Sequence, residues 1–143
     1  MKIYMAGPLF TAAELQFNKA VATRLRSFGH EVFLPQETEQ RSATSKEIFQ
    51  SDVDGIDWAE VVVANMDGPD PDSGTCWECG YAFEKKPILL YRTDIRTEAP
   101  PFGPYNLMLH ASADMVLDCT WKTTDEVGNI LVEALVALNE EAT

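Results

Sequence analysis

The sequence contains no long apolar run. No stretch of its 143 residues approaches the roughly 18 consecutive apolar residues of a membrane-spanning helix, which excludes a membrane span. The first residues, Met1 to Met5, carry one charge and lack the long apolar region and small-residue cleavage site of a signal peptide. We interpret them as a first strand and expect a cytoplasmic protein.

Basic residues are scarce. The chain has 11 Lys and Arg against 23 Asp and Glu, a formal net charge of −12. A nucleic-acid polymer requires clustered Lys and Arg to neutralise its phosphates, so the composition argues against such a partner but allows a small uncharged ligand. Solubility explains this acidity more simply than adaptation to a salt-rich host, and both interpretations stay open.

Motifs for common cofactors are missing. Gly7 stands alone after the first strand, without the G-x-G-x-x-G of a dinucleotide site, and there is no G-x-x-x-x-G-K-[ST] phosphate loop. His30 and His110 have no metal-ligand spacing and no serine elbow nearby. Three cysteines, an odd count, suit reduced thiols. We expect neither a cofactor nor a metal.

Short β-prone runs alternate with helical patterns along the chain. The expected strands are Lys2–Met5, Glu31–Leu34, Glu60–Met66, Pro87–Tyr91 and Met115–Leu117. The expected helices are one from Thr11 that Gly29 ends, one over Ser45–Ile56 with Ser45 as its N-cap, and those over Thr75–Glu84 and Thr123–Asn139. The first helix is expected to face inward with Leu15, Ala20, Val21, Ala22, Leu25 and Phe28, and the last with Val127, Ile130, Leu131, Ala134, Leu135 and Leu138. Gln36–Thr44, Asp67–Gly74 and Thr93–Tyr105 are expected loops.

This alternation predicts an α/β fold with a parallel sheet, and right-handed crossovers make it doubly wound. Five strands flanked by helices fit a Rossmann-like or flavodoxin-like layout. No repeat, linker or low-complexity stretch divides the sequence, so we expect one domain over residues 1–143.

In such a sheet, ligands bind outside the carboxyl ends of the strands. Three segments with unusual content leave those ends: Ala6–Phe10, Asp67–Gly74 and the stretch around Pro104–His110. Glu78 lies early in the helix after the second of these, where the helix dipole favours a negative charge. An ionised carboxylate at a cleft suits covalent glycosidic chemistry, with Asp72 facing the same cleft. The alternative is that these acidic residues only cap the helix.

Four segments resemble nucleoside 2-deoxyribosyltransferases. Ile3–Phe10 resembles their opening, and Pro71–Ala82 (PDSGTCWECGYA) resembles their fairly specific D-x-G-x-x-x-E-x-G-Y-A signature. Gln50–Ile56 resembles a segment with one fixed Asp, and Asn106–Met108 resembles an N-L-M motif. The segments occur in the family's order and cover most of the chain.

The resemblance implies a role for each matching residue. Glu78 would attack C1′ of the deoxyribose and form a covalent deoxyribosyl-enzyme, with Tyr4 orienting it by a hydrogen bond. Asp52 and Asp72 would contact the base, one of them protonating the departing base and deprotonating the incoming one. The implied substrate contacts are Gly7, Phe10, Asn106 and Met108, the last two reaching the 5′-hydroxyl region of a neighbouring subunit's site.

The resemblance thus implies a transferase of nucleotide salvage. It would act on deoxynucleosides and free bases as a homo-oligomer with shared sites, with hydrolysis as a side reaction. Each residue also has a plainer interpretation: Tyr4 as a core aromatic, Asp52 as a solvated helix residue, Met108 as core filler and Asn106 as a turn residue.

Three other functions remain open. A deoxynucleoside 5′-monophosphate N-glycosidase would share the fold and Glu78, but residues 7–11 offer few groups for a phosphate. A thiol-disulfide protein would use Cys76 and Cys79. A sensor would bind nucleotides without turnover. Base preference also stays open: Trp58, Trp77 and Phe10 could shape the base pocket, and spacing alone does not place them.

Overall fold

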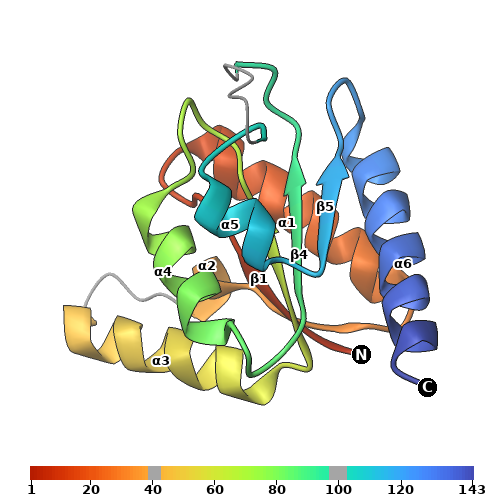
Figure 1. Cartoon of the computed structure of the whole chain (residues 1–143). Helices are drawn as coiled ribbons and strands as arrows, with labels where there is room; N and C mark the ends of the chain where they lie inside the picture. Colours follow the sequence, from red (N-terminus) through yellow and green to blue (C-terminus); the bar gives the residue numbers. More distant parts are fainter. Residues whose placement is uncertain (39–42, 97–102) are drawn as a thin grey trace.

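A computed structural model describes residues 1–38, 43–96 and 103–143 of the chain (Figure 1). The strands within these ranges are β1 Lys2–Ala6, β2 Glu31–Phe33, β3 Val61–Asn65, β4 Ile88–Arg92 and β5 Met115–Asp118. The helices are α1 Ala12–Ser27, α2 Pro35–Thr38, α3 Ser45–Trp58, α4 Ser73–Ala82, α5 Leu107–Ser112 and α6 Thr124–Glu141.

The strands form one parallel sheet in the order β2-β1-β3-β4-β5. This order reverses direction between β1 and β3, and at such a switch point the connections leave a crevice outside the carboxyl ends of the two strands. The strand order is that of flavodoxin-like sheets, and helices cover both faces (Figure 1). The expected doubly wound parallel α/β fold is therefore confirmed.

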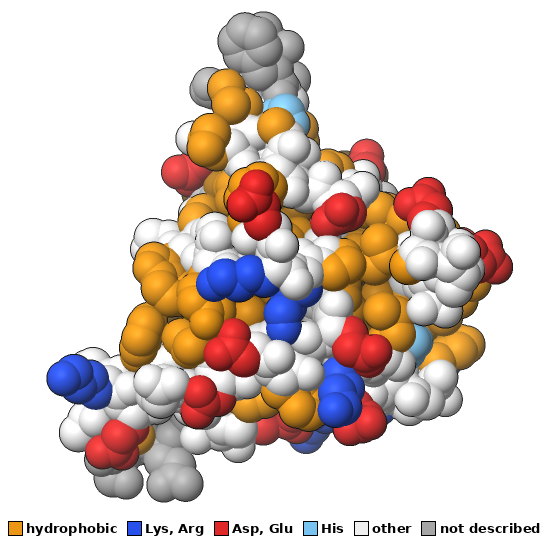
Figure 2. All heavy atoms as spheres, turned by 60° about the horizontal axis from the view of Figure 1, so that its bottom comes forward, with side chains coloured by type: hydrophobic (Ala, Val, Ile, Leu, Met, Phe, Trp, Pro, Cys, Tyr) orange, Lys and Arg blue, Asp and Glu red, His pale blue; other side chains and the backbone are white. Residues whose placement is uncertain are grey.

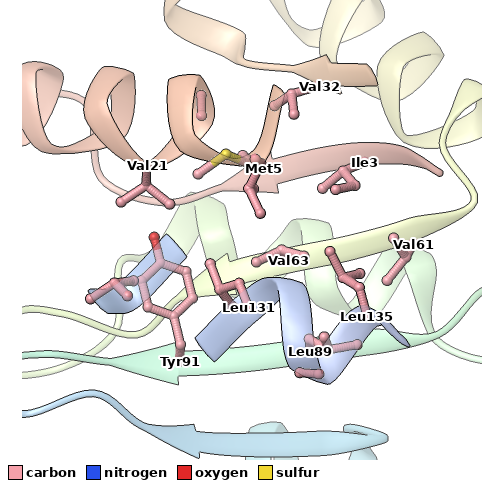
Figure 3. Packing of buried hydrophobic residues seen from close by; sticks show 14 of the residues in the cluster. Ile3, Met5, Val21, Val32, Val61, Val63, Leu89, Tyr91, Leu131 and Leu135 are labelled. Atoms are coloured by element: carbon pink, nitrogen blue, oxygen red, sulfur yellow. The ribbon is translucent and has the colours of Figure 1, made fainter. Parts of the chain in front are cut away.

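Alternate residues of the central strands enter two separate cores, because successive side chains of a strand point to opposite faces. Ile3, Val63 and Leu89 pack on the side covered by α1 and α6, where Figure 3 shows them with Tyr91 and Leu131. The opposite side, under α3, α4 and α5, receives the other set of strand residues: Tyr4, Ala6, Val62, Ala64, Ile88 and Leu90. Tyr4 therefore faces the layer of helices that includes α4.

Two short helices lie where only loops are predicted. Helix α2 falls at the start of the predicted loop Gln36–Thr44, and α5 lies in the segment around Pro104–His110. Helices this short show too few turns for an apolar period to stand out from the sequence. Residues 39–42 and 97–102 of the predicted loops lie outside the described residues.

The starts of two long helices also differ from the prediction. The N-cap of α3 is Thr44, not Ser45, because the Thr44 side chain accepts a hydrogen bond from the Glu47 amide. Helix α4 begins at Ser73 and so includes two residues that are predicted to be loop. Both positions offer adjacent residues with capping side chains, and propensity alone does not choose between them.

The inward face of α1 is narrower than predicted. Leu15 and Phe28 are exposed, and the Phe28 ring lies under the Arg24 guanidinium instead of in the core. Asn18, which is not expected on the inward face, is buried, and its side-chain amide donates to the Pro8 carbonyl and to Gln36 Oε1. The predicted inward residues of α6 are all buried except Ile130, which is partly buried. In the described ranges, no helix has the length and apolar character of a membrane span.

Candidate active site

Glu78 and Tyr4 meet between α4 and the sheet. The Tyr4 hydroxyl donates a short hydrogen bond to Glu78 Oε2. The two residues are far apart in sequence, and the switch-point topology brings them together because α4 follows β3 and packs over β1. The contact implied by the family resemblance is therefore present, while the catalytic roles of the two residues stay predictions.

The position of the Tyr4 ring is fixed by its surroundings. The side chain is fully buried, and its ring stacks on Phe33 of β2 with centroids 5.4 Å apart and an interplanar angle of 15°. Phe33 in turn packs closely under α3, since a Cβ added at Gly55 would lie 2.8 Å from the Phe33 ring. A buried ring with stacked neighbours presents its hydroxyl in one orientation, and this orientation points at Glu78.

A pocket of about 310 Å³ opens beside Glu78, between α3 and α4. A volume of this order lies at the small end of the range for small-molecule sites, roughly 300–1,000 Å³. Its walls are Phe49, Asp52, Val53 and Ile56 of α3, with Gly74, Trp77 and Glu78 of α4. Glu78 and Asp52 thus share one pocket, in which an apolar wall accompanies two carboxyl groups.

Asp72 serves as the N-cap of α4. Its Oδ2 accepts from the Thr75 amide at 3.0 Å and from the Thr75 hydroxyl at 3.1 Å, and Thr75 is fully buried. The capping interpretation of Asp72 is therefore correct as a description of its contacts. Both hydrogen bonds use Oδ2, so the cap orients Oδ1 without occupying it. Asp72 is not among the described residues that line the Glu78 pocket.

Gly7 and Phe10 lie after β1 and are also absent from the described lining of that pocket. A Cβ on Gly7 would lie 3.1 Å from Asn65 Cβ at the end of β3, so this position needs a very small residue for the two strand ends to approach. The Phe10 side chain is 71% exposed. The loop thus borders the switch point, and its expected contacts with substrate stay predictions.

Asn106 and Met108 lie on a different side of α4. They line a pocket of about 600 Å³ together with Cys76, Cys79 and Phe83. Asn106 caps α5, its Oδ1 accepting from the Met108 amide at 2.8 Å, while the Met108 side chain is 73% exposed. The structure therefore does not bring these residues to the Glu78 of their own chain.

The cysteine pair of the signature lies within α4 as free thiols. Burial raises the pKa of Cys79 to about 12, with the neighbouring Cys76 and Glu78 adding to the shift. Burial also raises the pKa of Cys76, helped by Asp70 and Asp72. A thiol-disulfide function needs a lowered thiol pKa, so this environment argues against that alternative. Among the described residues, no three His, Cys, Asp or Glu side chains gather as metal ligands.

The remaining pocket residues were missed or left unplaced by sequence reasoning, although a signal for some of them exists. Phe49, Val53 and Ile56 stand three or four residues from Asp52 or from one another, so helical periodicity places them on the face that carries Asp52. Of the three aromatic residues left unplaced, Trp77 lines the Glu78 pocket. Trp58 lines another hollow, beside Phe33 and Gly55.

Comparisons with known proteins agree on one family. A model of the nucleoside 2-deoxyribosyltransferase family matches residues 3–129. An uncharacterised protein of Ureaplasma parvum is 31% identical, with 93% of this chain and 96% of that protein covered. The structure of a 2-deoxyribosyltransferase from Bacillus psychrosaccharolyticus is similar, with a TM-score of 0.70, 28% identity and coverage of 90% of this chain and 91% of that one. A CMP N-glycosidase of Clostridium botulinum shares the fold at a TM-score of 0.66 and 18% identity, with 94% and 99% of the two chains covered.

Proposed function

The chain belongs to the nucleoside 2-deoxyribosyltransferase family, and from this premise we propose that it transfers the 2-deoxyribosyl group of a deoxynucleoside from one nucleobase to another. The observation that carries the proposal is the contact between Tyr4 and Glu78 at the edge of a pocket that also contains Asp52. A carboxylate held by a buried hydroxyl beside a second carboxyl group has the parts needed for covalent glycosidic chemistry.

In the first step, one oxygen of Glu78 attacks C1′ of the deoxyribose. The C1′–N bond breaks, and its electron pair leaves with the base, which takes a proton from a nearby carboxylic acid. A base is a poor leaving group unless it is protonated, so this acid is essential. The products of the step are a deoxyribosyl ester of Glu78 and a free base.

In the second step, a nitrogen of the incoming base attacks C1′ and displaces Glu78 as a carboxylate. The acid of the first step, now ionised, takes the proton from that nitrogen and is restored. Two displacements give net retention at C1′. Water in place of the second base gives hydrolysis, the expected side reaction.

Asp52 is the better candidate for the proton carrier. It shares the Glu78 pocket, whereas Oδ2 of Asp72 is engaged at the start of α4. We assign Asp72 to holding the first turn of α4, with Oδ1 directed to the base. Tyr4 orients Glu78 for attack and stabilises the carboxylate that departs in the second step.

A homo-oligomer with shared sites extends the same proposal. Asn106 and Met108 lie on the side of α4 away from their own Glu78 pocket, and Met108 is largely exposed. We infer that these two residues contact a second copy of the chain. Light scattering of the purified protein measures the assembly directly.

The deciding experiment is a base-exchange assay followed by chromatography. Wild-type protein is incubated with deoxyadenosine or thymidine and a second free base, alongside Glu78→Gln and a control variant, Glu133→Gln, on the remote helix α6. We expect a new deoxynucleoside with wild type and control, and a rate lower by roughly 10³-fold or more with Glu78→Gln. A parallel incubation contains a deoxynucleoside monophosphate, and base released only from that substrate would instead identify an N-glycosidase. Saturable binding without turnover would identify a sensor.

A further inference from the structure

An aromatic wall stands beside the nucleophile. Trp77 of α4 and Phe49 of α3 both line the Glu78 pocket, and their rings meet edge to face with centroids 5.2 Å apart and an interplanar angle of 67°. Both side chains are about half exposed, at 48% for Trp77 and 50% for Phe49. Large aromatic rings that are exposed to solvent in a pocket form an apolar surface, and a planar ligand can cover this surface and displace water from it.

The Trp77 ring is braced from behind. It stacks on Tyr81, one turn later in α4, with centroids 5.5 Å apart and an interplanar angle of 7°. The Tyr81 hydroxyl donates to Asp57 Oδ1 of α3 at 2.9 Å, and the Lys85 ammonium lies 3.5 Å from the Tyr81 ring centroid. These contacts connect α3 to α4 and hold Trp77 in place. Because the ring is already ordered, little binding free energy is spent on immobilising it when a ligand binds.

We propose that Trp77 is the residue against which the nucleobase packs, and that this contact makes the protein prefer purines. The inference rests on the proposed function in one respect, namely that the nucleobase occupies the Glu78 pocket. Stacking on an aromatic side chain favours the binding of a base. A bicyclic purine covers more apolar area of an indole ring than a pyrimidine does, and the free energy gained rises with the area covered.

The placement separates Trp77 from Trp58 and Phe10, the two other aromatic residues that the sequence suggests for the base pocket. Trp58 faces the hollow beside Phe33 and Gly55 and lies under the Lys2 ammonium, 5.6 Å from it. Phe10 is 71% exposed and does not contribute to the described pocket lining. Trp77 is therefore the tryptophan that shares a pocket with both Glu78 and Asp52, and Trp58 provides a matched control.

The test measures binding apart from turnover. Calorimetric affinities for deoxyadenosine and thymidine are compared in a Glu78→Gln background, alone and combined with Trp77→Ala, Trp77→Phe or Trp58→Phe. We expect Trp77→Ala to weaken deoxyadenosine binding about tenfold or more and thymidine binding less, because the purine overlaps the ring more. Trp77→Phe should give an intermediate loss, and Trp58→Phe should bind like the background variant.

Two results would overturn the inference. The first is that deoxyadenosine binds with the same affinity with and without the Trp77 indole. The second is that both nucleosides lose the same affinity while light scattering shows a change in the mass of the assembly, which would make Trp77 a subunit contact. Base exchange by the single Trp77 variants tests the proposed function independently. Trp77-dependent binding in a protein that exchanges no bases would overturn the transferase and leave the base-binding role of Trp77 standing.

Discussion

Tyr4 links the hydrophobic core to the proposed nucleophile, because its ring is fully buried and its hydroxyl contacts Glu78. Replacing it by phenylalanine keeps the ring stacked on Phe33 and removes the hydrogen bond to Glu78. A hydrogen bond to a charged group contributes about 1.5–3 kcal/mol. We therefore predict that Tyr4→Phe lowers kcat/KM for base exchange by roughly 10- to 100-fold, measured by steady-state kinetics.

A suitable control for this prediction is Tyr105→Phe. Tyr105 is buried, and its hydroxyl has no hydrogen-bond partner among the described residues, so its loss should leave base exchange close to that of wild type. Urea unfolding of both variants separates activity from stability. A Tyr4→Phe variant that folds normally and keeps wild-type kinetics would remove Tyr4 from the mechanism.

At the scale of single elements, the start of α4 combines a structural task with a proposed chemical one. The Asp72 carboxylate caps the helix, and its charge is proposed to serve the base. Loss of an N-cap costs about 1 kcal/mol of stability, whereas asparagine caps as well as aspartate does. We predict that Asp72→Ala lowers the unfolding free energy by about 1 kcal/mol in urea titrations, while Asp72→Asn leaves it near the wild-type value.

The same pair of variants separates the two tasks of Asp72. If its charge serves the base, Asp72→Asn loses activity although its stability is unchanged. If Asp72 acts only as a cap, Asp72→Asn exchanges bases at the wild-type rate and the entire effect appears in Asp72→Ala. Equal stability of both variants would contradict the capping role.

The long elements could be predicted from the sequence because each carries a strong periodic signal. The run Val61–Ala64 predicts a strand buried on both faces, and all four residues are buried in β3. The short helices α2 and α5 were missed because neither repeats a pattern. The predicted faces of α1 failed at Leu15 and Phe28, since side chains near helix ends can lie beyond the sheet that the helix covers.

The candidate site could be predicted only in part. The signature of α4 points to Glu78, and the family resemblance adds Tyr4 and Asp52. The aromatic wall could not be assigned, because sequence alone does not say that Phe49 of α3 faces Trp77 of α4. That contact depends on how two helices lie on the sheet, which is a tertiary property. The same limit explains why Asn106 and Met108 could not be assigned to a side of α4.

At the scale of the whole molecule, the chain carries 23 Asp and Glu against 11 Lys and Arg, and on the face that Figure 2 shows, acidic side chains are scattered with apolar patches between them. In the loops at the carboxyl edge of the sheet, some of the acidic side chains accept hydrogen bonds that hold the loops together. Asp67 accepts from the Thr93 amide and hydroxyl and from the Asp94 amide, and buried Arg92 donates to the carbonyls of Met66 and Gly68. These contacts connect the loop after β3 to the loop after β4. They therefore hold the chain segment that leads to Asp72 and α4.

Asp94 also connects these two loops, because its Oδ2 accepts from the Gly68 amide, and its charge makes the connection sensitive to acid. Hydrogen bonds from the Arg96 side chain hold the pKa of Asp94 well below its usual value near 3.8, and the Arg96 and Gly68 amides add to the shift. A carboxyl group whose pKa is lowered by folding adds stability above its unfolded pKa and loses it as the pH falls through the folded value. Glu37 changes the stability with pH in the same direction, because the hydrogen bond from the Arg26 side chain lowers the pKa of Glu37.

We therefore predict that the stability of the protein declines as the pH falls below about 4, where unfolded carboxyl groups take up protons before Asp94 does. Thermal unfolding from pH 7 to pH 2 measures this for wild type and Asp94→Asn. At neutral pH the variant should unfold at a lower temperature, because it lacks the charge that Arg96 binds. The gap between the two curves should narrow as the pH falls toward 2, because the unfolded wild-type carboxyl group takes up a proton over this range and the stabilisation by its charge decreases. A constant gap between the curves at every pH would show that Asp94 contributes through its shape and not through its charge.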